Sequence, residues 1–285
     1  MLREVIKQLD ISPGLIVVDG TVGAGGHSQE ILKNIGPEGT LIGVDRDPMM
    51  QKLAARVLDG PNCHLVRASY CDLKETLDQL GLEQVDRILL DLGLSSDQLA
   101  DVDRGFGFQA GGSLDMRFDT SQGEPAWKWI EEAEQAELEE IFREYGEERF
   151  ARAIAEKLVS RRSNRPVRTA ADLVEAVNEA IPRSIRKQSR RNPATRVFQA
   201  LRIAINNELA HVKQAINDTI PSVLRTGGRA AIISFHSLED RLVKQAFRDQ
   251  QRWQNLTSKP VVASAAEIRI NPRSRTAKLR VAIKK

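Results

Sequence analysis

The chain has 285 residues, of which 41% are hydrophobic and 28% are charged, and its formal net charge is +3. This length can bury the core of one large domain, or of one domain that carries a second, and the composition is that of a globular protein. No stretch approaches the roughly 18 apolar residues of a membrane span, residues 1–4 do not begin a secretory signal, and Cys63 and Cys71 match no zinc spacing. We therefore expect a cytoplasmic protein.

Charge is distributed unevenly along the chain. Residues 131–148 contain nine Glu and one Arg, whereas residues 183–202 and 269–285 each carry seven Lys or Arg and no acid. Separated basic blocks of this kind suit a phosphate backbone, but they suit solvated helix faces and a solubilising tail equally well. Charge by itself leaves nucleic-acid binding open.

Four short apolar runs predict buried strands in the first third of the chain. They lie at residues 15–18, 41–44, 64–66 and 88–90, and three of them end at an acid: Asp19, Asp45 and Asp91. Helical segments fit between the strands, one over about 28–34 and one that starts near Pro48. This alternation indicates βαβ units and a parallel sheet.

The pattern becomes helical from about residue 125. Apolar spacing predicts a helix over 138–145, a second over 147–160 and a third from Thr169, as its N-cap, to Ala180. A long helix is predicted from Phe198 to Ile216, strand character returns at 230–233, and the last strands are predicted near 261–270 and 278–283. We expect a sheet domain of residues 1–101 and 203–285 interrupted by a helical insertion of residues 102–202.

The strand-end acids predict where a ligand binds, because open parallel sheets bind ligands beyond the carboxyl ends of their strands. The turn at residues 19–28 reads DGTVGAGGHS, and its glycines at 23, 25 and 26 do not have the Gly-x-Gly-x-x-Gly spacing of dinucleotide enzymes. An acid followed by such a turn is similar to the class I methyltransferase pattern, so an NAD enzyme is the less favoured alternative. Asp45 is placed to accept hydrogen bonds from ribose hydroxyls.

Longer motifs match a known family over almost the whole chain. Beyond the glycine turn they are GVDRD at 43–47, DLGLSSDQ at 91–98, RGFGF at 104–108, LDMR at 114–117, YGEER at 145–149, PATRVFQALR at 193–202, ISFHSLEDR at 233–241, NPRSR at 271–275 and AKLR at 277–280. The chain thereby resembles the RsmH (MraW) family of bacterial 16S rRNA (cytosine-N4)-methyltransferases. It departs from the usual pattern at Tyr70, Ser113 and Asn192, where Phe, Pro and His are common.

The resemblance implies a fold, a reaction and a set of contacts. The fold is α/β, a class I (Rossmann-like) S-adenosylmethionine-dependent methyltransferase sheet with an inserted all-helical domain. The reaction transfers a methyl group from S-adenosylmethionine to the N4 amine of a decoding-site cytidine in small-subunit rRNA and leaves S-adenosylhomocysteine. The implied cofactor contacts are Gly25, Gly26, His27, Asp45, Tyr70, Asp91 and Gln98.

The chemistry requires positioning of a poor amine nucleophile and an acceptor for its hydrogen bond, and it needs no metal. Asp91 is the predicted acceptor, or else it orients the cofactor. His236 is the second catalytic candidate, although a lone His is often structural. The predicted contacts to rRNA are Arg117, Arg190, Arg191 and Arg196.

Several alternatives stay open at this point. Arg117 could pair with Asp115 instead of gripping phosphate, and Phe106 and Phe108 could stack on an extruded base or form a local core. A methyltransferase of DNA or protein and a non-catalytic RNA-binding module are the rival functions. The residues do not distinguish naked rRNA from the small ribosomal subunit as the partner, or a monomer from a homodimer, and they give no reason to expect a membrane partner.

Overall fold

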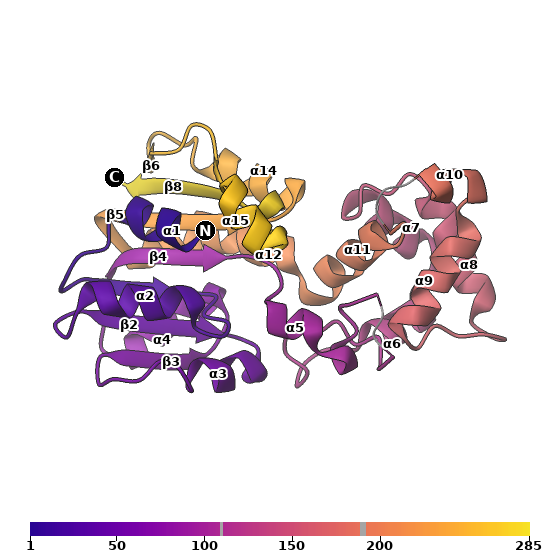
Figure 1. Ribbon diagram of the computed structural model, residues 1–285, viewed down its shortest axis with the longest axis horizontal. Helices are drawn as coiled ribbons and strands as arrows, with labels where there is room; N and C mark the ends of the chain where they lie inside the picture. The colour runs from indigo at the N-terminus through magenta and orange to yellow at the C-terminus, as the bar shows by residue number, and fades with distance from the viewer. Residues whose placement is uncertain (109–110, 189–191) are drawn as a thin grey trace. The chain divides into compact units, whose positions relative to one another are not determined.

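The computed structural model describes residues 1–108, 111–188 and 192–285, and the four strands predicted in the first third of the chain are all present (Figure 1). Across these residues one eight-stranded sheet has the order β3-β2-β1-β4-β5-β8-β6, with β7 paired to β8. Strands β1 to β5 pair in parallel and β8 runs antiparallel to its neighbours. The strands are β1 (Ile16–Asp19), β2 (Thr40–Asp45), β3 (Cys63–Arg67), β4 (Val85–Asp91), β5 (Leu224–Ser234), β6 (Trp253–Asn255), β7 (Val261–Val262) and β8 (Lys278–Lys284).

Both faces of the sheet are covered, which confirms the predicted α/β fold. Successive strand residues point to opposite faces, so Val17 and Leu41 join one buried cluster while Val18 and Ile42 join the other. The first face is covered by α1 (Leu2–Leu9), α2 (Gly26–Ile35) and α3 (Pro48–Ala54). The second is covered by α4 (Leu73–Gln79), α12 (Glu208–Gln214), η3 (Ala215–Thr219), α13 (Ile220–Val223) and α14 (Ser237–Ala246).

The chain divides into two units. The sheet unit comprises Met1–Gly93 and Leu209–Lys285, and the helical unit comprises Leu94–Glu208. The helical unit therefore starts before the expected residue 102 and ends after the expected residue 202, because Leu94 and Ile205 pack against its core. Its elements are α5 (Ser96–Ala100), η2 (Val102–Arg104), α6 (Ala126–Glu132), α7 (Gln135–Glu144), α8 (Ala151–Arg161), α9 (Ala170–Ala180), α10 (Arg183–Gln188) and α11 (Thr195–Asn206).

The helical unit has a core of its own. Phe142 of α7 and Leu173 of α9 are fully buried in it together with Leu201 of α11. Thr169 is the N-cap of α9 as predicted, and its hydroxyl accepts a hydrogen bond from the Asp172 N–H at 3.2 Å. Each unit thus buries apolar surface around its own centre.

The single helix predicted from Phe198 to Ile216 is wrong. It is broken at Asn207, which adopts the left-handed conformation with φ 51°. The apolar residues on the two sides of this break serve different cores: Phe198 and Leu201 belong to the helical unit, whereas Val212 and Ile216 pack under the sheet. The regular spacing therefore runs through two helices that have no common partner.

The strand predicted near 261–270 is also wrong, apart from the two residues of β7. Most of this segment forms the helix α15 (Ala265–Ile270), which the 3₁₀ turn η4 (Pro272–Thr276) follows. The hydroxyl of Ser264 caps the helix by accepting from the Glu267 N–H at 3.1 Å. The short strand β6 was not predicted.

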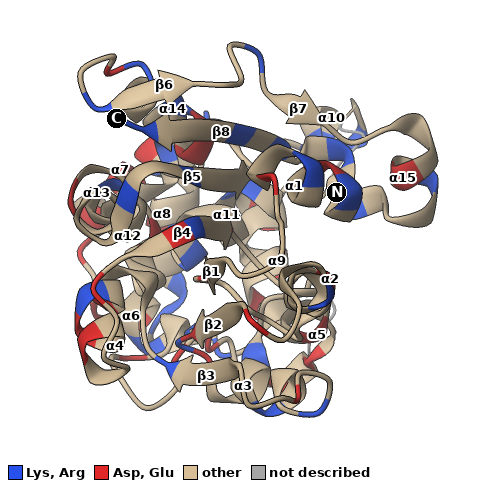
Figure 2. Ribbon diagram, turned by 90° about the vertical axis from the view of Figure 1, so that its left-hand side faces the viewer, with Lys and Arg blue, Asp and Glu red and all other residues tan. Residues whose placement is uncertain are grey.

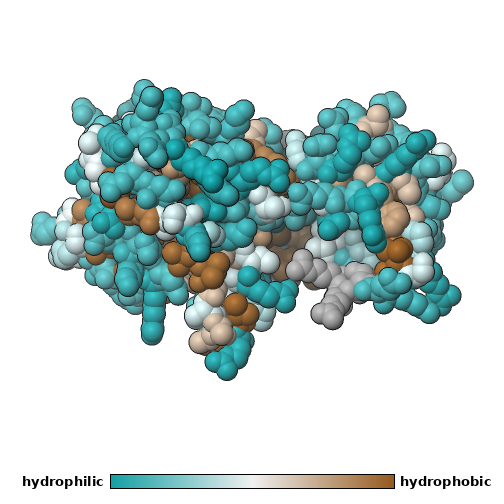
Figure 3. All heavy atoms as spheres, turned by 90° about the horizontal axis from the view of Figure 1, so that it is seen from above, coloured by the Kyte–Doolittle hydropathy of each residue, from teal (hydrophilic) through white to brown (hydrophobic). Residues whose placement is uncertain are grey.

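Charged residues lie mainly on helices and connections, and basic residues mark both ends of β8 (Figure 2). The face in Figure 3 is mostly hydrophilic, with small separate apolar patches. None of the described helices combines the length and the apolar character that crossing a bilayer requires.

We predict that Asn207→Ala lowers the free energy of unfolding by about 1 kcal/mol, whereas Asn207→Gly leaves it nearly unchanged. The physical reason is that a Cβ makes the left-handed conformation costly, while Asn tolerates it and Gly adopts it freely. Urea unfolding followed by circular dichroism measures both values. An alanine variant as stable as the glycine variant would contradict this role of Asn207.

Candidate active site

Side chains from three neighbouring strands meet at the carboxyl edge of the sheet. Asp19, Asp45 and Asp91 end β1, β2 and β4, and β1 lies between the other two strands. The glycine turn that follows β1 leads into α2 at the same edge. The strand-end acids therefore lie close together, as their positions in the sequence predicted.

Asp19 organises the turn from within. Its side chain is buried, and one carboxylate oxygen accepts from the Ser28 hydroxyl at 2.7 Å while the other accepts from the Thr21 N–H at 3.2 Å. Burial raises the pKa of Asp19, against the lowering effect of His27 and of these hydrogen bonds. Both oxygens of Asp19 face the protein, so its part in the site is to hold the turn.

Asp45 joins the turn to β2. Its Oδ2 accepts from the Gly23 N–H at 3.0 Å, and its Oδ1 accepts from the Asp47 N–H at 2.9 Å. Burial raises the pKa of Asp45 to about 6, and the two N–H donors oppose that rise. Each oxygen keeps a second lone pair, so the ionised carboxylate can accept further hydrogen bonds.

The glycines of the turn serve two different needs. Gly23 and Gly25 have positive φ values of 53° and 89°, a conformation that side chains other than Asn and Asp rarely adopt. A Cβ on Gly26, the first residue of α2, would meet no atom within 4 Å, so this position faces open space. The half-buried Tyr70 begins the 3₁₀ helix η1 (Tyr70–Asp72), and its Cβ would be 3.1 Å from a Cβ placed on Gly20.

Asp91 combines a strongly raised pKa with a carboxylate oxygen that has no hydrogen-bond partner among the described residues. Its Oδ2 lies 3.5 Å from Nδ1 of His27, whereas its buried Oδ1 has no hydrogen-bond partner among the described residues. Burial raises the pKa of Asp91 to about 7; the negative charge of Glu239 adds to the rise and Arg273 opposes it. Burial lowers the pKa of His27, so its ring is neutral at pH 7.

Thr21 is a site residue that the sequence analysis missed. Its hydroxyl accepts from the backbone N–H of Asp91 at 2.6 Å and so ties the glycine turn to the end of β4. Ser28, the partner of Asp19, was missed in the same way. Both residues belong to the DGTVGAGGHS motif, and a search for hydroxyl side chains within it could have found them.

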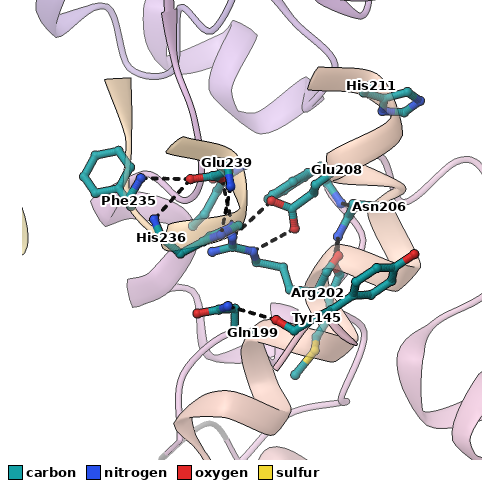
Figure 4. Close-up of polar contacts among 12 residues, drawn as sticks. Tyr145, Gln199, Arg202, Asn206, Glu208, His211, Phe235, His236 and Glu239 are labelled. Atoms are coloured by element: carbon teal, nitrogen blue, oxygen red, sulfur yellow. Dashed lines mark hydrogen bonds and ion pairs between the residues drawn. The ribbon is translucent and has the colours of Figure 1, made fainter. Parts of the chain in front are cut away.

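His236 has a structural position. It is the N-cap of α14, and its Nδ1 accepts from the Glu239 N–H at 3.4 Å, while Oε2 of Glu239 accepts from the Phe235 N–H at 2.8 Å (Figure 4). Its Nε2 is 3.0 Å from Oε1 of Glu239 but outside hydrogen-bond geometry. The ring thus shapes the turn after β5 through Glu239.

The other predicted contacts belong to the helical unit. Gln98 is buried, and its Oε1 accepts from the Ser95 N–H at 3.0 Å in a capping box at the start of α5. Arg117 binds both carboxylate oxygens of Asp115, at 2.8 and 2.7 Å, and its remaining nitrogen donates to the Gly123 carbonyl at 2.9 Å. Arg196 is exposed and donates to the Glu147 carbonyl at 2.9 Å. Arg190 and Arg191 lie outside the described residues.

The aromatic residues of the long loop also belong to the helical core. Phe106 stacks on Phe118 with ring centroids 5.6 Å apart, and Phe108 meets Phe198 edge-on at 4.8 Å. The local-core alternative for these two rings therefore describes their packing. At the end of this unit Arg202 pairs with both oxygens of Glu208, at 2.8 and 3.0 Å (Figure 4).

A family model described as the MraW methylase family matches residues 1–285 of the chain. The chain belongs to this family. It is 44% identical over 304 residues to "Ribosomal RNA small subunit methyltransferase H" of Trichlorobacter lovleyi, with 100% of this chain and 96% of the relative covered. The protein of the same name from Thermotoga neapolitana is 46% identical over 285 residues, with 99% and 94% covered.

Membership in the MraW methylase family rests on sequence. A crystal structure of an rRNA methylase from Streptococcus thermophilus has a TM-score of 0.44 at 11% identity, with 99% of this chain and 93% of that chain covered. The class I, Rossmann-like fold follows from this chain's own strand order, in which five parallel strands are extended by the antiparallel β8.

We predict that Asp91→Asn stabilises the protein at pH 8, on the order of 2 kcal/mol, and by much less at pH 5. The folded protein keeps a proton on Asp91 between pH 4 and about 7 that the unfolded chain has lost, so the free energy of unfolding falls as the pH rises through this window. The amide carries no charge and avoids this cost. Urea unfolding at both pH values measures it.

The matched control for this experiment is Asp78→Asn, a change of the same chemistry at an exposed position in α4. We expect this control to change stability equally little at both pH values. A gain for Asp91→Asn that is the same at pH 5 and pH 8 would show that the buried charge is not its cause.

Proposed function

We propose that the protein is an S-adenosylmethionine-dependent methyltransferase that methylates the N4 amine of a decoding-site cytidine in 16S rRNA. The observation that carries this proposal is the buried Oδ1 of Asp91 at the carboxyl edge of the sheet, which has no hydrogen-bond partner in the part of the chain that the structure describes, in a member of the MraW methylase family. The names of the relatives support rRNA as the substrate class. The choice of N4 of cytidine comes from the motif resemblance.

The residues at the edge of the sheet fit S-adenosylmethionine. Gly26 faces open space at the start of α2, which leaves room for a ligand against the backbone. Asp45 offers two acceptor oxygens of the kind that bind ribose hydroxyls. Tyr70 offers an aromatic side chain to the adenine, and the carboxylate of Asp91 suits a cationic ligand. Gly25 and His27 complete the contacts of the sheet unit, and the motif resemblance adds Gln98 to the proposed set.

When bound, S-adenosylmethionine supplies a methyl group that is attached to its positively charged sulfur. Transfer of this methyl group leaves the sulfur behind in a neutral thioether. The N4 amine is a poor nucleophile, so the task of the protein is to hold it in line with that methyl group and to localise its lone pair. We assign the second part to Oδ1 of Asp91, which can accept a hydrogen bond from the amine N–H and then take its proton. A pKa of about 7 suits a base that works near neutral pH.

Neighbouring residues keep Asp91 ready for this role. Thr21 fixes its backbone through the 2.6 Å hydrogen bond, and the neutral ring of His27 lies beside Oδ2 without adding a charge that would lower the pKa of Asp91. His236 shapes the turn after β5 as a helix cap, so we assign the proton transfer to Asp91 and a positioning role to His236.

On the substrate side we propose Arg196, Arg190 and Arg191 as contacts to rRNA phosphates. Arg196 is exposed and keeps part of its guanidinium available after its bond to Glu147. Arg117 is the weakest member of the predicted set, because Asp115 and a carbonyl occupy its nitrogens. The proposed reaction uses no metal, because the sulfonium of S-adenosylmethionine brings its own leaving group.

We predict that Asp45→Ala weakens the affinity for S-adenosylmethionine at least tenfold, which corresponds to about 1.4 kcal/mol. The variant loses both acceptor oxygens and releases the Gly23 N–H that anchors the turn. Isothermal titration calorimetry measures the affinity, with the exposed Asp78→Ala as the control. An affinity equal to that of the unchanged protein would refute the role of Asp45.

We predict that the enzyme transfers methyl groups to small ribosomal subunits or naked 16S rRNA from cells that lack it, and that the product nucleoside is N4-methylcytidine. Nucleoside mass spectrometry identifies the product, and the comparison of the two substrates decides which form is used. We expect the rate to rise with pH through about 7 as Asp91 ionises, and Asp91→Asn to reduce it by roughly 10²-fold or more. Transfer only to DNA or protein would contradict rRNA as the substrate, and a product other than N4-methylcytidine would contradict the proposed target atom.

A further inference from the structure

The basic tail at residues 269–285 divides into two groups in the structure. Four of its seven cations lie on β8 or directly after it. Lys278 and Arg280 bind the carboxylate of Asp240 at 3.1 and 2.7 Å. Lys284 donates to the carbonyls of Pro221 and Leu224, and Lys285 donates to the carbonyl of Gln250. These four hold β8 in place and are not available to a ligand.

The remaining three cations lie on α15 and η4. Arg269 and Arg275 are exposed and make no hydrogen bond or ion pair within the described residues, whereas Arg273 is half-buried and has an interaction of its own within the protein. Ile270, between them in sequence, is 88% exposed, which is unusual for a large apolar side chain. We call Arg269, Ile270, Arg273 and Arg275 the edge surface.

Strand register places the edge surface beside the candidate active site. Asp91 pairs with Ile233, and Ile233 pairs with Leu279 of the antiparallel β8. Leu279 is therefore two strand spacings, about 10 Å, from Asp91. The turn η4 ends at Thr276, shortly before Leu279, so it lies at the same carboxyl edge of the sheet. Arg273 also lies close enough to Asp91 for its positive charge to lower the pKa of that carboxyl.

We propose that the edge surface binds the RNA strand next to the target nucleotide, with Arg269 and Arg275 on phosphates and Ile270 against a neighbouring base. This inference rests on the proposed function. Guanidinium groups are suited to phosphate, and contacts to phosphates set the position of a strand without reading its sequence. The carboxylate of Glu267, on the same helix, is occupied by the Met1 amino group at 2.9 Å. An exposed apolar side chain among cations matches an unstacked base beside its backbone.

The test compares two pairs of arginines. Arg269→Ala/Arg275→Ala removes the two exposed arginines of the edge surface. The control, Arg248→Ala/Arg252→Ala, removes two exposed arginines that precede Trp253 in the chain, and Trp253 pairs with Lys284 at the other end of β8. Binding of a fluorescein-labelled single-stranded RNA carrying the target sequence is measured by anisotropy over a range of salt concentrations. A third variant, Arg269→Lys/Arg275→Lys, keeps both charges.

We predict that the edge variant binds this RNA about tenfold or more weakly at low salt. The slope of log Kd against log salt should fall by about 1.4, which is two single-strand contacts of ~0.7 each. The lysine variant should keep most of the slope, and affinity for S-adenosylmethionine should not change. RNA affinity equal to that of the unchanged protein, or a loss no larger than in the control pair, would overturn the inference.

The binding experiment needs no methyl transfer, so it stands apart from the proposed function. If the unchanged protein fails to methylate rRNA while the edge variant still loses RNA affinity, the proposed reaction fails and the surface remains. If methylation occurs and the edge variant has an unchanged KM for RNA, the surface inference alone fails. Loss of binding to small subunits without loss of binding to naked RNA would indicate a protein contact and would also overturn it.

Discussion

The candidate site depends on the hydrogen bonds that the buried carboxylate of Asp19 accepts. It receives the Ser28 hydroxyl from α2 and the Thr21 N–H from the turn, so one side chain at the end of β1 sets both the turn and the start of the helix. Thr21 in turn holds the backbone of Asp91, and Gly23 is held by Asp45. Three strand ends are thereby joined by hydrogen bonds that run through a few residues of one glycine-rich turn.

The same arrangement explains why the acids of the site differ. Asp19 is fully buried with each oxygen bonded to the protein, Asp45 has the same number of bonds but is partly exposed, and Asp91 keeps one oxygen without a partner among the described residues. A buried acceptor without a partner costs free energy, which a fold tolerates where a ligand or a reaction uses the group. The carboxylate oxygens are thus increasingly available to a ligand in the order Asp19, Asp45 and Asp91.

The basic side chains also divide into those that are bonded within the fold and those that are exposed. Basic blocks that look alike in sequence contain arginines such as Arg280, which is buried against Asp240, and arginines such as Arg269, which is exposed at the edge of the sheet. Arg117 and Arg202 likewise each form an ion pair with a carboxylate, that of Asp115 and that of Glu208. Counting charges along the chain therefore overstates the surface that can bind RNA, because several of the charges stabilise the fold.

The sequence alone determined the parts of the protein that depend on local pattern. Apolar runs located β1 to β4, the acids that end three of these strands located the edge where the candidate site lies, and the glycine turn with the longer motifs indicated the family. Spacing failed where tertiary contacts decide: the run from Phe198 to Ile216 is regular, yet its residues pack in two cores and Asn207 breaks it. Only the tertiary structure revealed Thr21 and Ser28 as supports of the candidate site, His236 as a helix cap, and the oxygen of Asp91 that no described residue hydrogen-bonds. Hydrogen bonds between residues such as Thr21 and Asp91, 70 positions apart, follow from the register of the sheet, and no local pattern encodes them.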